Sequence, residues 1–353
     1  MSERKLLECL DHMTMNNKYT EKERLLRVLS GKLVDRPPVI CPGGMMNGAV
    51  TEVIESLTEN HNVDLKAMIT AAKLVYDQTG FENYGVPFCM TAESEPLGIE
   101  VHFGDKYIEP RVTKYSKLPM EAVVKLEAIC PQKEPRMKTV IDAIEQLANE
   151  DVPVIGNITG HMSTASSIVD PNIVFKYLLK KPDLSMEFMS YVNDYLIDYA
   201  IEMIKAGADV IAISDPTATG EILGKRIFEK YAVPFYQDFV NAIKPYGIPV
   251  IFHMCGNAKN VLESIDKAGF NALSFDSIVN MKQAKEVITT QLMGNVNTQS
   301  LNFGTLEKIE ALTKVCLDSG VDIVSPACGL GMSTSIRQIK SMTQYVKEGY
   351  SHV

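Results

Sequence analysis

The chain of 353 residues is poor in positive charge: 35 lysines and arginines stand against 44 aspartates and glutamates, for a formal net charge of −9. Nucleic-acid binding demands a basic surface, so we expect no nucleic-acid partner. No apolar run is long enough to cross a bilayer, and we expect no membrane association. Residues 1–5 precede a short mixed segment without the apolar core of a signal peptide, so we expect a cytoplasmic protein.

Tryptophan is absent, and the 7 cysteines form no disulfide framework, because their number is odd and their spacing is scattered. In a reducing compartment, cysteine therefore serves either burial or chemistry. Hydrophobic residues make up 46% and charged residues 22%, the balance of a soluble globular enzyme with an ample core. This length suits one large barrel or two ordinary domains.

One motif has the residue types of a metal site. The apolar run 248–251 is typical of a buried strand and leads into His253 and Cys255, which face the same way because side chains alternate along a strand. Cys328 follows another such run, 322–326. One imidazole and two thiolates suit Zn²⁺ and leave its fourth position open, as in a catalytic site. The competing interpretation is plain burial, since free cysteine is among the most buried residue types.

Strand-like apolar runs alternate with longer amphipathic stretches along the chain. Three glycines, Gly207, Gly269 and Gly320, each stand just before a run and predict the left-handed turn that ends a helix. Repeated helix–glycine–strand units imply parallel strands with helices outside them. Eight such units predict an α/β fold, a (β/α)8 TIM barrel. The runs are 38–41, 84–89, 152–158, 209–214, 249–253, 272–275, 291–296 and 322–326.

Two additions to the barrel are predicted. Thr20 and Glu23 form a capping box that begins a helix, and Gly31 ends it, so residues 1–36 should be an N-terminal helical extension. Between about residues 90 and 117 the pattern turns short and alternating, which predicts a hairpin-type insertion over one end of the barrel. We find no long linker, so we expect residues 1–353 to form a single TIM-barrel domain.

Four polar residues are further candidates, because chemistry in such barrels lies at the carboxyl ends of the strands. Asp215 is a catalytic candidate, although an aspartate before proline is also ordinary turn chemistry. Asp276 could complete the metal's coordination, hydrogen-bond His253, or cap the following helix. Asn157 and Asn295 could bind a polar cofactor or ligand at the same mouth, or Asn295 could cap the next helix.

Five sequence elements occur together along nearly the whole chain: 24–31 with 34–38, 207–216, 253–257, 293–296 and 326–329. In this combination the chain resembles the zinc-dependent methylcobamide:coenzyme M methyltransferases of the uroporphyrinogen decarboxylase-like superfamily. The resemblance implies that His253, Cys255 and Cys328 bind Zn²⁺ and that Asp276 corresponds to the family's carboxylate after the next strand.

The resemblance also implies a reaction, the transfer of a methyl group from a methylated corrinoid (methylcobamide), carried by a partner corrinoid protein, to a small-molecule thiol such as coenzyme M. Zinc suits this chemistry because a free thiol titrates at about 8.5, whereas a metal-bound thiol is deprotonated outright. Coenzyme M is a sulfonate and calls for a cationic or amide-rich pocket, yet no lysine or arginine stands at a predicted strand end.

Other functions remain open at this point. The methyl acceptor could instead be homocysteine or tetrahydrofolate. A uroporphyrinogen decarboxylase-type lyase fits less well, because the decarboxylases use arginines at the end of the first strand and residues 41–47 contain none. A barrel that only binds a corrinoid protein is disfavoured, since all three metal ligands are present. The sequence leaves the oligomeric state undetermined.

Overall fold

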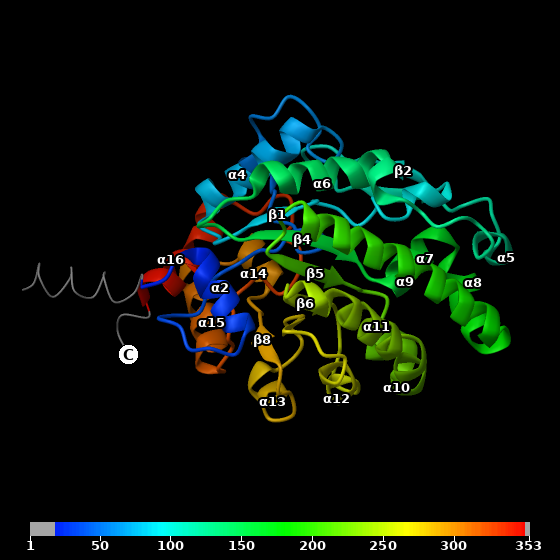
Figure 1. Ribbon diagram of the computed structural model, residues 1–353. Helices are drawn as coiled ribbons and strands as arrows, with labels where there is room; N and C mark the ends of the chain where they lie inside the picture. Colours follow the sequence, from blue (N-terminus) through cyan, green and yellow to red (C-terminus); the bar gives the residue numbers. More distant parts are fainter. Residues whose placement is uncertain (1–17, 350–353) are drawn as a thin grey trace, which may run out of the picture.

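The computed structural model describes residues 18–349 (Figure 1). Expectations for the earlier part of the 1–36 extension, including residues 1–5, fall outside the described residues. The strands are β1 (Tyr84–Val86), β2 (Glu100–His102), β3 (Arg111–Lys114), β4 (Val154–Thr159), β5 (Val210–Ser214), β6 (Val250–Met254), β7 (Ala272–Phe275) and β8 (Gln291–Met293).

Helices follow and flank these strands, and none of those described combines the length and hydropathy that crossing a bilayer requires. The α-helices are α2 (Glu21–Leu29), α3 (Thr51–Ile54), α4 (Leu65–Thr79), α5 (Met120–Val123), α6 (Pro135–Leu147), α7 (His161–Ile168), α8 (Pro171–Lys180), α9 (Pro182–Lys205), α10 (Gly220–Tyr231), α11 (Val233–Ile243), α12 (Leu262–Asp266), α13 (Met281–Lys285), α14 (Thr298–Phe303), α15 (Leu306–Asp318) and α16 (Ile336–Gly349). Short 3-10 turns are η1 (Glu95–Leu97), η2 (Pro131–Lys133) and η3 (Lys244–Tyr246).

Six strands form one parallel sheet in the order β1-β4-β5-β6-β7-β8. The remaining two predicted strands, 38–41 and 322–326, pair through isolated parallel bridges instead of regular ladders: Val39 with Val324, and Met293 with Ile323. The N–H of Glu82, just before β1, donates to the carbonyl of Val39 at 2.9 Å. Backbone pairing therefore passes from β8 through both segments to the start of β1.

The interior of this ring is one buried apolar cluster. Its members from the sheet and the two bridged segments are Ile40, Ile155, Val210, Ala212, Ile251, Ala272, Met293 and Ile323. Residues from both edges of the sheet thus share a single interior, as the strands of a closed barrel do. The predicted TIM-barrel architecture is confirmed. Its first and last barrel strands, residues 38–41 and 322–326, are short.

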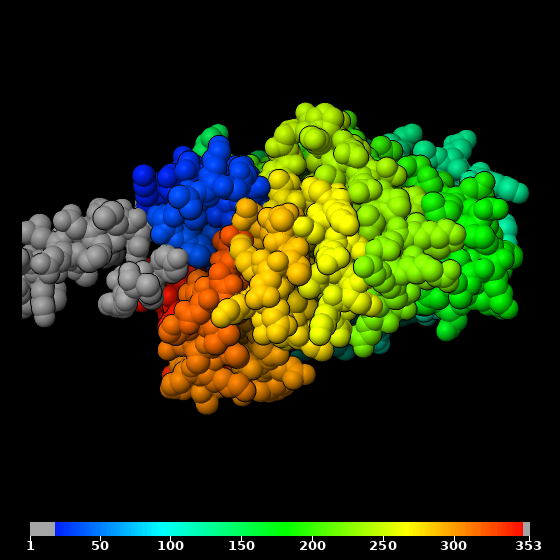
Figure 2. Space-filling view, turned by 90° about the horizontal axis from the view of Figure 1, so that it is seen from below, coloured from blue at the N-terminus to red at the C-terminus, as the bar shows by residue number. Residues whose placement is uncertain are grey.

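Helix α2 closes the amino end of the barrel. The predicted capping box is present: Thr20 Oγ1 accepts the N–H of Glu23, and the Glu23 carboxylate accepts the N–H of Thr20. Leu25 and Leu29 of α2 join the interior cluster, and the Asn271 amide, just before β7, donates to the Leu29 carbonyl at 3.1 Å. Figures 1 and 2 both show α2 beside α15 and α16, so the two ends of the described chain meet at this end.

Two further sequence expectations agree with the structure. Gly207, Gly269 and Gly320 have φ values of 108°, 90° and 76°, the left-handed conformation expected of a glycine that ends a helix before a strand. The insertion is a two-stranded antiparallel hairpin of β2 and β3, separate from the barrel sheet. The strands that carry the mouth and the hairpin that overhangs it are therefore placed as predicted.

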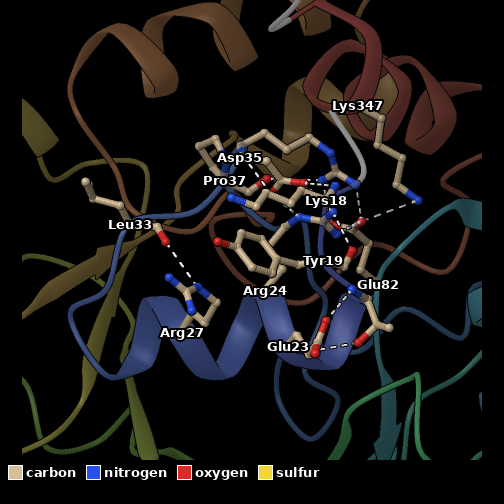
Figure 3. A network of polar contacts seen from close by, with 12 residues as sticks. Lys18, Tyr19, Glu23, Arg24, Arg27, Leu33, Asp35, Pro37, Glu82 and Lys347 are labelled. Carbon is tan, nitrogen blue, oxygen red and sulfur yellow. Dashed lines mark hydrogen bonds and ion pairs between the residues drawn. The ribbon is translucent and has the colours of Figure 1, made fainter. Parts of the chain in front are cut away.

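A buried cluster of ions holds the seam between segment 38–41 and β1 (Figure 3). The Glu82 carboxylate accepts hydrogen bonds from Arg36 Nη1 and from the backbone N–H of Val39, both at 2.9 Å. Arg24 contacts both Glu82 and Asp35, and the Arg24 and Glu82 side chains are each only 1% exposed. Burial alone would raise the pKa of Glu82, but the Arg36 hydrogen bonds and charge lower it below the ordinary 4.5.

We predict that Glu82→Gln lowers the free energy of unfolding at neutral pH by about 3–5 kcal/mol, because it leaves buried arginines uncompensated. The native pKa of Glu82 is depressed, so its contribution is complete above the unfolded value of 4.5 and is lost as pH falls through the native pKa. Urea unfolding across this range should show a steep acid decline in the wild type and a shallower one in the variant.

The matched control is Glu100→Gln, which removes the exposed ion pair with Lys114, whose side chain is 68% exposed. Its effect should stay within about 1 kcal/mol. Equal losses in the two variants would mean that the seam does not depend on the buried carboxylate.

Candidate metal centre

Alternation along β6 aims two side chains at the barrel mouth. Ile251 lies in the interior cluster, whereas Phe252 and Met254 pack in the outer cluster beneath the helices. His253 and Cys255 are the next two alternate residues after Ile251, so their side chains also face the interior. The structure therefore places both residues on the interior side, at the carboxyl end of the strand.

His253 is oriented by a neighbour on the next strand. Its partner in register on β7 is Ser274, and Ser274 Oγ lies 3.0 Å from His253 Nδ1. The other ring nitrogen, Nε2, is buried and has no hydrogen-bond partner among the described residues. A buried, unpartnered imidazole nitrogen fixed from behind is the arrangement of a metal-binding histidine.

The two thiols complete a group with metal-site dimensions. Cys255 Sγ and Cys328 Sγ are 3.9 Å apart, and the ligand atoms of His253, Cys255 and Cys328 all lie within 4.8 Å of one another. Two sulfurs at about 2.3 Å from a tetrahedral ion stand about 3.8 Å apart, so the spacing fits Zn²⁺ without rearrangement. A shared proton raises the pKa of Cys255 and lowers that of Cys328, and a bound cation would replace that proton.

Asp276 lies beside this group. Its Oδ2 is 3.4 Å from Cys255 Sγ and accepts the N–H of Gly256, while Oδ1 accepts the N–H of Ile278. Burial would raise the pKa of Asp276, but these backbone hydrogen bonds lower it. Of the roles considered from sequence, the structure does not use Asp276 to orient His253 or to cap α13. Ser274 does the first, and Asn280 caps the helix.

Asp215 lies outside the group of ligands and points toward the helical layer. Its carboxylate accepts the backbone N–H groups of Met162 and Ser163 at the start of α7, and the Tyr236 hydroxyl at 2.9 Å. The residue is fully buried, and its neighbours on β5, Ile211 and Ile213, likewise pack in the outer cluster. Asp215 thus caps a helix in the barrel wall.

The two candidate asparagines brace backbone near the mouth. Asn157 donates to the carbonyls of Pro42 and Val86 at 2.7 and 3.2 Å, while its own Oδ1 is buried without a partner among the described residues. Asn295 donates to the carbonyls of Asp276 and Val279, each at 2.9 Å. Asn157 therefore links the end of the first barrel strand (38–41) to β1. Asn295 holds the loop that carries Asp276.

Two residues near the centre were missed in the sequence. Ser274 stands two positions before Asp276, and the period of two along β7 could have revealed it. Glu109, in the hairpin loop, lies beside the Asn47 side chain and lines the cavity next to Cys328. It lies close enough for its charge to raise the pKa of Cys328. Nothing local in the sequence pointed to Glu109, because only the fold brings the hairpin over the mouth.

A cavity of about 1060 Å³ opens at the metal centre. Cys328 lines it from the end of the last barrel strand. Met45 lines it from the loop after segment 38–41, Phe88 from the loop after β1, and residues 107–111 from the hairpin. Small molecules therefore have access to the Cys328 side of the ligand group.

The chain is similar to known proteins over almost its full length. Residues 20–349 match the family model described as uroporphyrinogen decarboxylase (URO-D). The methylcobamide:CoM methyltransferase MtbA of Methanosarcina acetivorans is 32% identical over 334 residues, 93% of this chain and 98% of that protein. The methylcobamide:CoM methyltransferase MtaA of Methanosarcina barkeri is 30% identical and is matched over 100% of its length.

A solved structure shares the architecture. A methyltransferase from Methanosarcina mazei superposes with a TM-score of 0.85 at 29% sequence identity, covering 94% of this chain and 99% of that one. The overall architecture of this chain therefore also occurs in a protein named as a methyltransferase.

We predict that Asp215→Asn destabilises the fold without removing the metal site. An asparagine turns an N–H₂ group toward donors that now meet a carboxylate, so the free energy of unfolding should fall by about 2–4 kcal/mol. Metal content per folded chain should equal that of the wild type. Urea unfolding and elemental analysis measure the two effects, and loss of metal from a variant that remains folded would contradict this placement of Asp215.

Proposed function

The chain belongs to the uroporphyrinogen decarboxylase (URO-D) family, and from this membership we propose that it transfers a methyl group from a methylated corrinoid to a thiol, with coenzyme M as the acceptor. The observation that carries the proposal is the convergence of the ligand atoms of His253, Cys255 and Cys328 within 4.8 Å of one another. Relatives matched over nearly their whole length are named for this reaction.

We assign Zn²⁺ to these three residues, because two thiolates and one imidazole are a ligand set that zinc favours. When bound, zinc supplies the positive charge that keeps a thiol deprotonated at neutral pH. Cys255 and Cys328 contribute two negative charges, which together balance a divalent ion. An incoming thiolate therefore keeps much of its electron density for attack on the methyl group.

Other residues keep this centre in place. Ser274 fixes the His253 ring at Nδ1 and leaves the buried Nε2 free to bind a metal. Asp276, at 3.4 Å from Cys255 Sγ, is near enough to take the fourth position or to receive the proton of the acceptor thiol. Asn295 holds the backbone of Asp276 in position. Asn157 stabilises the rim of the mouth, and Asp215 stabilises its wall.

The methyl group moves in line from cobalt to sulfur, so the corrinoid must approach the carboxyl end of the barrel. We propose a corrinoid protein as the partner that covers this mouth, with the β2–β3 hairpin as part of its contact. All six cysteines among the described residues are free thiols, which suits the reducing cytoplasm that we propose as its location.

The alternative functions fit the structure less well. A uroporphyrinogen carries many carboxylates, yet the residues that line the cavity next to Cys328 are mainly apolar or uncharged and include one arginine. Decarboxylation also gives the two thiols no task. Transfer to homocysteine would use the same zinc ligands and differs from the main proposal only in the acceptor. Transfer to tetrahydrofolate does not require a metal-activated thiol.

We predict one zinc per chain and thiol-dependent demethylation of methylcobalamin, followed by the change in cobalt absorbance. Cys328→Ser should lose zinc and methyl transfer together, because a serine hydroxyl is a poor substitute for a thiolate ligand. The matched control is Cys130→Ser at an exposed cysteine outside the ligand group, which should retain both.

The results separate the parts of the proposal. Full zinc and full rate in Cys328→Ser would refute the ligand assignment. A wild type that holds zinc but demethylates methylcobalamin with neither coenzyme M nor homocysteine, and that is equally inactive with a methylated corrinoid protein, would refute the proposed reaction.

A further inference from the structure

The cavity beside Cys328 carries very little charge. Among the described residues that line it, Glu109 and Arg111 are the only two with charged side chains, and both come from the hairpin insertion. Much of the remaining lining is apolar, including Met45, Phe88 and Leu330. A charged ligand that enters this cavity therefore meets one cation and one anion, both placed by the same short segment.

The two charged residues are engaged differently. Glu109 lies beside the side chain of Asn47, which is itself 4% exposed. Asn47 also accepts the N–H of Leu330 at its carbonyl, so Glu109 belongs to the wall next to Cys328. Arg111, in contrast, is an exposed residue and takes part in none of the ion pairs found within residues 18–349. Its guanidinium is available to a ligand.

The backbone that carries Arg111 is anchored. The hairpin turn is closed by Asp105, whose carboxylate accepts the N–H groups of Tyr107 and Ile108 at 2.7 and 3.0 Å. Outside the hairpin, Asn60 donates to the Gly104 carbonyl at 3.0 Å, and the Thr51 hydroxyl donates to the Lys106 carbonyl. Thr51 lines the same cavity. Arg111 therefore extends from a segment fastened to the barrel rim, and less entropy is lost on binding than for an arginine on a loose loop.

We propose that Arg111 binds the anionic group of the methyl acceptor and so selects thiols that carry a sulfonate. This inference rests on the proposed methyl transfer and identifies the residue that recognises its acceptor. A guanidinium presents planar paired donors that match the oxygens of a sulfonate. Arg111 and Cys328 line the same cavity, so one cavity can receive both the sulfonate and the thiol of a small acceptor. Glu109, on the Cys328 wall, disfavours anions placed there and so favours one orientation.

The test compares two thiols of equal carbon length, 2-mercaptoethanesulfonate and uncharged 2-mercaptoethanol, with methylcobalamin as donor. Arg111→Gln should raise the KM for the sulfonate thiol about ten- to a hundredfold, the loss expected for one charged hydrogen-bonding partner. The kcat at saturation, the zinc content and the kinetics with 2-mercaptoethanol should remain those of the wild type. Lys114→Gln, on the same strand but outside the cavity lining, is the matched control and should change neither thiol's KM.

A second measurement keeps this inference separate from the proposed reaction. Ethanesulfonate has no thiol, and its binding to the zinc-loaded protein can be titrated by calorimetry without any methyl transfer. Binding to the wild type and its loss in Arg111→Gln would support the anion site even if no methyl transfer occurred, in which case only the proposed function would fail. No ethanesulfonate binding, an unchanged KM for the sulfonate thiol, or an equal loss with both thiols would overturn the role of Arg111.

Discussion

The buried carboxylate of Glu82 is the interaction on which the rest of the barrel depends. It accepts the backbone N–H of Val39 and pairs with Arg36 and Arg24. It therefore joins segment 38–41 to β1, where regular strand pairing is missing. A charge inside a protein is stable only when paired and hydrogen-bonded, and here both conditions are met by residues on either side of the seam. Without this closure, nothing would hold the loop after segment 38–41 at the mouth of the barrel.

The candidate metal centre uses that closure together with strand register. His253, Ser274 and Asp276 come from two adjacent parallel strands, β6 and β7, or their ends. Cys328 follows segment 322–326, which pairs with segment 38–41. The ligand group is thus assembled across much of the ring, from parts distant in sequence. Asp215 shows the complementary use of a strand end, because its carboxylate turns outward and accepts hydrogen bonds from N–H groups at the start of α7 that have no partner within the helix.

In the proposed function, the hairpin adds substrate recognition to this barrel. The strands supply soft ligands for a metal, and the hairpin supplies the only charged side chains that line the cavity among the described residues. Such a division separates the chemistry, held by a rigid barrel, from acceptor choice, held by a segment that can change without disturbing the strands. Asn47 joins the two parts, since it contacts Glu109 of the hairpin and Leu330 of the loop that follows Cys328.

Local patterns in the sequence were enough for the parts of this protein that depend on neighbouring residues: the capping box at Thr20, the glycine turns, the βα period, and the shared direction of His253 and Cys255. The direction of Asp215 was beyond them, because every residue of β5 is buried on both faces of the strand and hydropathy does not distinguish the interior from the helical side. Tertiary structure alone decided that Ser274 orients His253 and that the hairpin places Glu109 and Arg111 in the lining of the cavity that Cys328 also lines. Those contacts join segments far apart in the chain, and only the closed barrel sets their distance.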